Sequence, residues 1–261
     1  MTSIHNDNVR IVNIVGDSHS AYFKLPDQMA ARRCGLPHPL PYEVRTKVIY
    51  GASLIGLRGE SGKLKVRDAI RGIAKESSHL VLAFGQVDLE LGYYYRNVIK
   101  GEKVSPTEFV DALISSMRLF FGEVDLGAIR CALKGVNLTA YNDRAFASRY
   151  IGGILSERYA QDAVEEVVKM TRAEFLGEVG QNEMHVLFNN RISSLANERG
   201  YAYFDINHYL ASKDSRGVPI SPPVVDPTFL SIRKDHHVVK SLAMYREHYL
   251  AVGNAFSILQ G

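Results

Sequence analysis

Short apolar runs recur along the chain between segments with helical periodicity. The runs that predict strands are "RIVNIVGD" (10–17), "EVRTKVIYG" (43–51), "SHLVLAFG" (78–85), "IRCALKGVNLTAY" (129–141) and "YAYFDIN" (201–207). Runs of this kind, separated by helices, are typical of a parallel sheet that is covered on both faces. The pattern therefore predicts a three-layer α/β protein around a central, mainly parallel five-stranded sheet.

Two helices are marked by their own sequence. In "SPTEFVDALISSMRLFF", Ser105 is a typical N-cap, Pro106 stands at the first helical position and Glu108 completes a capping box. The last helix is expected to begin at about Asp235. The apolar residues that then share one helical face are Val238, Leu242, Tyr245 and Tyr249.

Residues 144–200 contain no clear strand, and stretches such as "QDAVEEVVKMTRAEF" have helical spacing. We interpret them as a helical insertion between the fourth and fifth strands, which serves as a lid or as a contact in a homo-oligomer. Because no linker rich in Pro or Gly divides the chain, residues 1–261 are expected to form a single domain.

Composition narrows the classes of partner and compartment. The net charge is only +3, so nothing indicates a nucleic acid or a membrane surface as partner. The longest apolar runs are too short for a membrane span, and the start "MTSIHNDNVR" lacks the apolar stretch of a secretory signal. Cys34 and Cys131 are far apart, which favours reduced core residues in a cytoplasmic protein.

Polar residues gather where the predicted strands end, and in an open parallel sheet that edge binds ligands. The blocks at these ends, followed by one before the last helix, are "GDSHS" (16–20), "GAS" (51–53), "GQVD" (85–88) and "KDHHVV" (234–239). Asp17, Ser18 and His19 follow the first strand directly. Gly-Asp-Ser after a strand is also a common turn and cap sequence, so the block by itself has a purely structural interpretation.

In this order, the blocks resemble those of the SGNH, or GDSL-type, hydrolase superfamily over most of the chain apart from residues 144–200. The resemblance implies a flavodoxin-like fold and a nucleophilic serine after the first strand, which is Ser18 here. Asp17 and His19 are then grouped with the residues that bind the oxyanion or the substrate. The Gly-Asp-Ser-His form looks most like a subgroup that occurs beside bacterial surface-polysaccharide genes.

The middle blocks match the family in part. Gly51 matches the glycine whose backbone N–H helps to form the oxyanion hole. Gly85 and Asp88 match two positions of the family's Gly-x-Asn-Asp, but Val87 replaces the asparagine. Gln86 carries a similar amide and is the candidate substitute after a small backbone shift. Asp88 has the alternative interpretation of a turn residue at a strand end.

The last block departs from the family's Asp-x-x-His. Asp235 stands two residues before His237, and Lys234 occupies the expected position of the acid. We assign His237 as the base for Ser18, with Asp235 or a backbone carbonyl orienting its other nitrogen; Asp235 could instead cap the last helix. His236 is the second candidate base. Because the two side chains are adjacent, they are expected to diverge, so that only one faces the serine.

The chemistry explains why these residue types are needed together. A serine hydroxyl is a poor nucleophile at neutral pH, so an imidazole must take its proton and a carboxylate must orient that imidazole. The resemblance implies hydrolysis of an ester on a small molecule or a glycan, with an O-acetyl or other O-acyl group of a carbohydrate preferred, and no cofactor. Two alternatives stay open: acyl transfer to a sugar, and a degenerate member that binds a glycan or a protein partner without catalysis.

A metal site is not expected. The candidate group is Asp235, His236, His237 and His208. No histidine pair has the i, i+4 spacing of a helical metal site, and the cysteines are not clustered.

Overall fold

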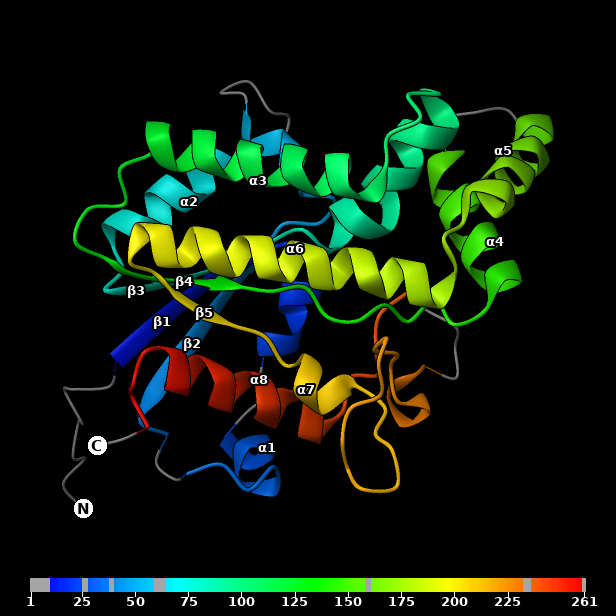
Figure 1. The fold of residues 1–261 in the computed structure, drawn as a ribbon. Coiled ribbons are helices and arrows are strands. Elements are labelled where there is room, and N and C mark those ends of the chain that lie inside the picture. Colours follow the sequence, from blue (N-terminus) through cyan, green and yellow to red (C-terminus); the bar gives the residue numbers. More distant parts are fainter. Residues whose placement is uncertain are drawn as a thin grey trace, which may run out of the picture.

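Five parallel strands form one sheet in the order β2-β1-β3-β4-β5 (Figure 1). This is a computed structural model, and it describes residues 10–24, 28–37, 40–58, 64–157, 161–231 and 236–259. The strands are β1 (Arg10–Gly16), β2 (Tyr42–Val48), β3 (His79–Ala83), β4 (Arg130–Lys134) and β5 (Ala202–Phe204). Every neighbouring pair is parallel, which confirms the predicted sheet.

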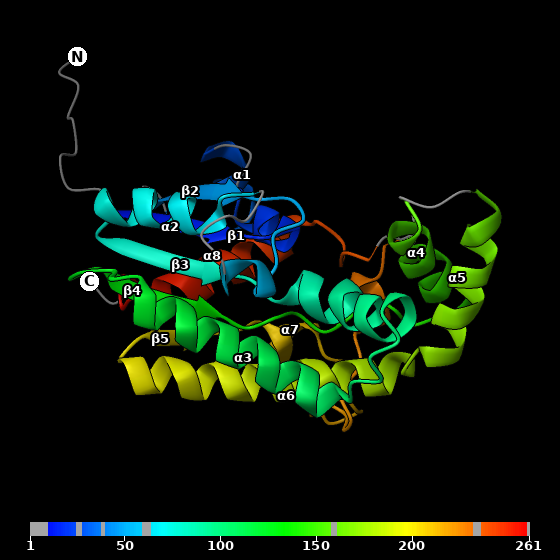
Figure 2. The same cartoon turned by 90° about the horizontal axis from the view of Figure 1, so that it is seen from above.

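Helices cover both faces of this sheet (Figures 1 and 2). One face carries α2 (Val66–Lys75), α3 (Pro106–Glu123) and α6 (Gly177–Arg199), and the other carries α1 (Gln28–Arg33) and α8 (Leu242–Ala255). Successive side chains of a strand point to opposite faces. On β3, Leu80 and Leu82 therefore join the first core cluster, while Val81 joins the second. All three are buried, as expected for a strand between two helical layers.

The first residues of two helices can be compared with the helix starts that the sequence predicted. At α3, Ser105 and Glu108 form the predicted capping box. The last helix, α8, begins at Leu242 instead of near Asp235, because the Ser241 hydroxyl accepts the Met244 N–H at 3.2 Å and caps it. The apolar periodicity predicted too early a start for this helix, because buried residues of the preceding loop continue the same helical spacing of apolar positions. Asp235 lies outside the described residues.

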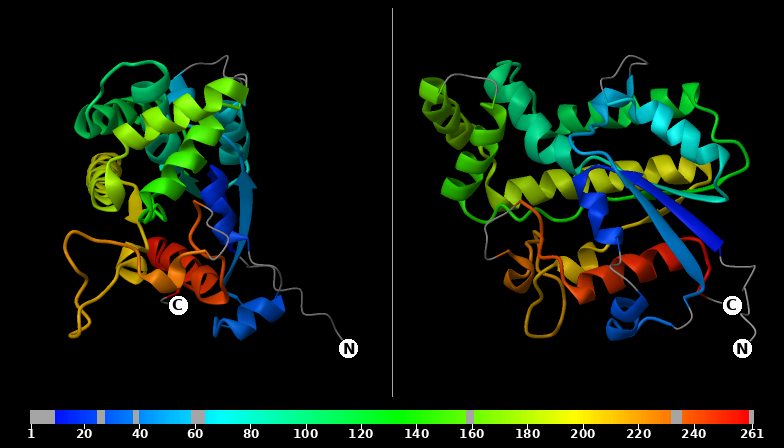
Figure 3. Two further views of the ribbon diagram at one scale, coloured as in Figure 1. Left: turned by 90° about the vertical axis from the view of Figure 1, so that its right-hand side faces the viewer. Right: turned by 180° about the vertical axis from the view of Figure 1, so that it is seen from behind.

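The segment predicted as an insertion divides into two structural parts. α4 (Arg144–Leu155) and α5 (Gln161–Glu174) pack on each other at one end of the molecule, away from most of the sheet (Figure 3). α6 instead packs on α3, β4 and β5, and its Phe188 and Leu195 are fully buried in the core. Within residues 144–200, α4 and α5 are therefore the helices that extend beyond the three layers.

The remaining elements are short. They are α7 (Asn207–Leu210), the 3-10 helices Ser18–Phe23, Ile55–Arg58 and Pro227–Phe229, and the π-helical turns Asp88–Gly92 and Tyr95–Ile99. Across the described part of the chain, every helix is too short or too polar to cross a bilayer. Cys34 and Cys131 are buried free thiols, and burial raises the pKa of Cys131 to about 12.

Candidate active site

Ser18 is held at the carboxyl end of β1 by a close approach between β1 and β3. A Cβ at Gly16 would lie 2.2 Å from the carbonyl oxygen of Ala83, so only glycine fits there. The next N–H, from Asp17, donates to that same oxygen at 3.1 Å. The Asp17 carboxylate then accepts the His19 N–H at 2.9 Å and caps the 3-10 helix that Ser18 begins. Ser18 is half-buried at this strand end.

Two imidazoles border the Ser18 hydroxyl. His237 Nε2 lies 3.2 Å from Ser18 Oγ, and His19 Nδ1 lies 3.4 Å from it. The rings of His19 and His237 are stacked with their centroids 4.2 Å apart. His237 comes from the loop before α8, 219 residues after the serine, so only the tertiary fold brings the two together. The first and last blocks of the sequence therefore meet in space.

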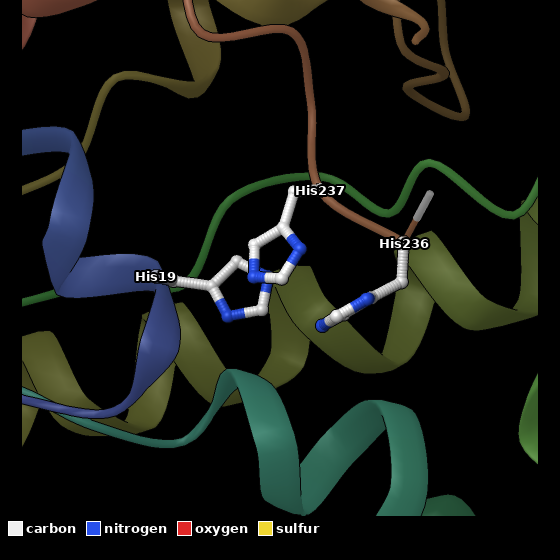
Figure 4. Close-up of side chains that lie close together, drawn as sticks. All are labelled: His19, His236 and His237. Carbon is white, nitrogen blue, oxygen red and sulfur yellow. The ribbon is translucent and has the colours of Figure 1, made fainter. Parts of the chain in front are cut away.

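Because His236 and His237 are adjacent, their side chains were expected to diverge. In the structure the two rings lie close together instead. The two ring centroids are 3.6 Å apart, and the His236 ring lies 5.2 Å from that of His19. Figure 4 shows the three imidazoles gathered between the 3-10 helix and the loop before α8. A hydrogen bond between His236 Nδ1 and the hydroxyl of Tyr150, from α4, holds the ring on this side. A tertiary contact has thus overridden the expected orientation.

Two buried carboxylates stand beside His19. Asp17 Oδ1 is 3.4 Å from His19 Nδ1, and Glu90 Oε2 is 3.8 Å from His19 Nε2. Burial raises the pKa of Asp17 to about 6, and hydrogen bonds from the backbone N–H groups of His19 and Val87 oppose this rise. The His19 imidazole therefore lies between two carboxylates, next to Ser18.

Gln86 does not replace the asparagine that the third block lacks. Its amide nitrogen donates to Glu90 Oε1 at 2.7 Å and to the Asn137 carbonyl at 3.2 Å. Its amide oxygen accepts the Asn137 N–H at 2.8 Å. The whole amide is buried and engaged in this network, so it cannot donate to an oxyanion near Ser18 without breaking these bonds.

Asp88 and Gly51 determine backbone conformation in the third and second blocks. Asp88 Oδ2 accepts the Leu54 N–H at 2.8 Å, which ties the segment after β2 to the turn after β3. That turn is tied to the serine block, because the Val87 N–H lies 3.5 Å from Asp17 Oδ2. Gly51 has φ +72°, and a Cβ there would meet nothing within 4 Å. Glycine is needed there for the turn conformation and not for a close approach.

Sequence reasoning missed a buried cation, Lys134, at the end of β4. Its Nζ donates to the Gly135 carbonyl at 2.8 Å and to Asn137 Oδ1 at 3.0 Å. Burial lowers its pKa to about 8, and the charges of Asp17 and Asp205 oppose this decrease. The signal was present as a single lysine within the apolar run "IRCALKGVNLTAY". The cation offsets part of the negative charge buried beneath Ser18.

Asp88 should make stability depend on pH. Burial, with a smaller contribution from Asp17, raises the pKa of Asp88 from 3.8 to about 7. Between these values the folded chain binds a proton that the unfolded chain has lost, so this part of the stability is lost as pH rises through about 7. Asp88→Asn keeps an oxygen for the Leu54 N–H but carries no charge.

Relative to the wild type, the Asp88→Asn variant should gain about 1 to 3 kcal/mol in free energy of unfolding between about pH 4.5 and about pH 8. Urea unfolding of both proteins at the two pH values measures this change. A difference between the two proteins that stays constant with pH would contradict the assigned shift.

Comparison with solved structures found several similar chains. A GDSL-like lipase from Bacteroides thetaiotaomicron is 11% identical and has a TM-score of 0.47, over 96% of this chain and 88% of its own. An extracellular lipase from Streptomyces rimosus is 11% identical, with a TM-score of 0.46 over 93% of this chain and 100% of its own. A third structure reaches a TM-score of 0.50 at 13% identity, over 97% of this chain and 99% of its own.

No family model matches the sequence, and the search of curated proteins found no relative. The strand order and the place of Ser18 after β1 nevertheless agree with the blocks recognised in the sequence. The meeting of the first and last blocks at Ser18 and His237 agrees with them as well. The chain is a three-layer α/β protein with a five-stranded parallel sheet, and its overall fold is similar to that of the structure with a TM-score of 0.50.

Proposed function

We propose that the chain is a serine-dependent esterase that removes an O-acyl group, with acetyl esters of carbohydrates as the preferred substrates. The observation that carries the proposal is the 3.2 Å contact between His237 Nε2 and Ser18 Oγ. This distance lies within the hydrogen-bond reach that a general base needs to take the proton of a nucleophile.

The reaction then follows from the positions of these two groups. His237 takes the hydroxyl proton while Ser18 Oγ attacks the ester carbonyl carbon and forms a tetrahedral intermediate. The intermediate collapses when the bond to the alcohol breaks and His237 returns the proton to that alcohol. Water, activated by the same imidazole, attacks the acyl-serine and releases the acid. Ser18 and His237 then regain their starting forms.

Oxyanion stabilisation in this scheme depends on backbone donors. Ser18 lies in the first turn of its helix, where N–H groups have no intrahelical partner, so its own N–H is one donor. The Gly51 N–H is the second candidate. Val87 supplies no side-chain donor, and the loss of one donor typically costs about 10²–10³ in rate. We therefore expect the esterase to be slow. The absence of this donor also favours the alternative function, a glycan-binding protein without catalysis.

A cavity between the second and third blocks supports a small polar substrate. It has a volume of about 480 Å³, and its lining includes Ser53, Val87 and Asp88 but neither Ser18 nor His237. That volume is typical of small-ligand pockets, which range over about 300–1,000 Å³. Tyr95, which is 43% exposed, and two arginines, Arg58 and Arg96, line the cavity as well. Because the apolar side chains of Ile55, Leu91 and Leu155 line it too, the cavity suits a sugar ring that carries a short acyl group.

The substrate proposal is tested by comparing leaving groups and acyl lengths. Aryl acetate, butyrate and octanoate should be hydrolysed with decreasing kcat/KM, and acetate should be released from an O-acetylated oligosaccharide. Acyl transfer is recognised by the appearance of a new sugar ester when an acceptor sugar is added. If every ester is left intact while the oligosaccharide still binds in calorimetry, the non-catalytic interpretation is correct.

A further inference from the structure

The three imidazoles at Ser18 form a group that ester hydrolysis does not require. His19, His236 and His237 each offer a ring nitrogen, and these three atoms all lie within 4.8 Å of one another (Figure 4). A serine hydrolase needs one histidine as base, so the other two imidazoles require a different explanation. This group differs from the one considered in the sequence, because His19 belongs to it and His208 does not.

The spacing of the three rings suits a transition-metal ion. Zinc bound by imidazole has Zn–N distances of about 2.0–2.1 Å, which places tetrahedral ligand nitrogens about 3.3 Å apart. The nitrogens lie within 4.8 Å of one another, and rotations of the side chains that separate the stacked rings of His19 and His237 are needed to point them at one ion. Three histidines also leave a fourth tetrahedral position, and the Ser18 hydroxyl already borders two of the rings.

Groups behind the imidazoles support the same interpretation. Histidine ligands of a metal commonly use their second nitrogen on a carboxylate or another polar group, which orients the ring. His236 Nδ1 bonds to the Tyr150 hydroxyl in this way. His19 has Asp17 and Glu90 at 3.4 and 3.8 Å from its two ring nitrogens. Both carboxylates are buried, and a cation bound at this place would stabilise their charged forms.

We propose that His19, His236 and His237 bind a divalent transition ion such as Zn²⁺, and that the bound ion stops the chemistry of Ser18. The inhibitory part rests on the proposed esterase function. If the ion binds His237 Nε2, it takes the lone pair that must accept the serine proton. If it binds Nδ1, its charge makes Nε2 a much weaker base. In either case Ser18 keeps its proton, so it is not an effective nucleophile.

The binding part is tested without any substrate. Chelator-treated full-length protein is titrated with Zn²⁺ in a calorimeter, and Co²⁺ is added separately to read its visible absorption. Wild type should bind Zn²⁺ at one site and show the spectrum of a low-coordinate Co²⁺ ion, whereas Mg²⁺ should not bind because it prefers oxygen ligands. His236→Ala should weaken Zn²⁺ binding at least about tenfold, and Tyr150→Phe should do so by about tenfold.

His208→Ala is the matched control, because His208 is exposed on α7 and outside the group. It should bind Zn²⁺ as the wild type does. Circular dichroism of every variant checks that the fold is kept. Failure of the wild type to bind Zn²⁺, or equal weakening in His208→Ala and His236→Ala, would overturn the proposed site.

Measurements of esterase activity with added Zn²⁺ distinguish a failure of the proposed inhibition from a failure of the proposed esterase function. Each rate is divided by the zinc-free rate of the same variant. Zn²⁺ should inhibit the wild type and His208→Ala alike, and His236→Ala should need at least about tenfold more Zn²⁺ for half-inhibition. Binding without inhibition, or activation by Zn²⁺, would overturn the inhibitory part. If no variant hydrolyses esters, the proposed function fails, and the calorimetry still decides whether the metal site exists.

Discussion

Replacing Ser18 by alanine is expected to lower kcat/KM for an aryl acetate by about 10⁴-fold or more, because the variant has no oxygen to form the acyl-enzyme. The fold should be kept, since Ser18 is half-buried and the Asp17 carboxylate caps the helix through the backbone. Steady-state kinetics and thermal unfolding of the purified variant measure the two effects separately.

Ser20→Ala is the matched control for this variant. Ser20 lies in the same "GDSHS" block, but its hydroxyl is buried and donates to the Asp17 carbonyl at 2.7 Å. It should lose roughly 1 kcal/mol of stability with that hydrogen bond and keep most of its activity. Equal activity losses in both variants would mean that the helix, and not the Ser18 hydroxyl, is what catalysis depends on.

Replacing His237 by alanine is expected to have the second largest effect, a loss of about 10³-fold or more in kcat/KM, because no other group then takes the serine proton as effectively. Added imidazole should restore part of the rate by entering the space left by the side chain. The comparison variant is His236→Ala, whose ring bonds to Tyr150. It should lose much less activity than His237→Ala does. The reverse order would transfer the role of base to His236.

The sequence predicted the framework of the sheet well because each strand is a local signal. A run such as "SHLVLAFG" is apolar on both faces, and it becomes β3 between two helical layers. The capping box at Ser105 is equally local and is present at α3. α6 was assigned to the insertion because its polar residues obscure the face that packs on the sheet. Its Gln181, Asn182 and His185 are all fully buried.

The site was only partly predictable, for a different reason. Ser18 follows directly from the strand and the block after it, and His237 followed from its place before the last helix. The convergence of His19 with His236 depends on Tyr150, which comes from α4, and no sequence pattern specifies that contact. The engagement of Gln86 with Asn137 is equally tertiary, since 51 residues separate them. Local reasoning therefore paired Ser18 with His237, which lie together in the structure, and missed what surrounds them.

Covalent labelling with a fluorophosphonate tests the central claim most directly, because the reagent phosphonylates a serine only where a base has activated it. Intact-mass and peptide mass spectrometry of the labelled wild type should show a single adduct on the peptide that carries Ser18. The Ser20→Ala variant should label like the wild type, and Ser18→Ala should not label. An adduct that persists in Ser18→Ala, or an unlabelled wild type that is correctly folded, would contradict the assignment of Ser18 as an activated nucleophile.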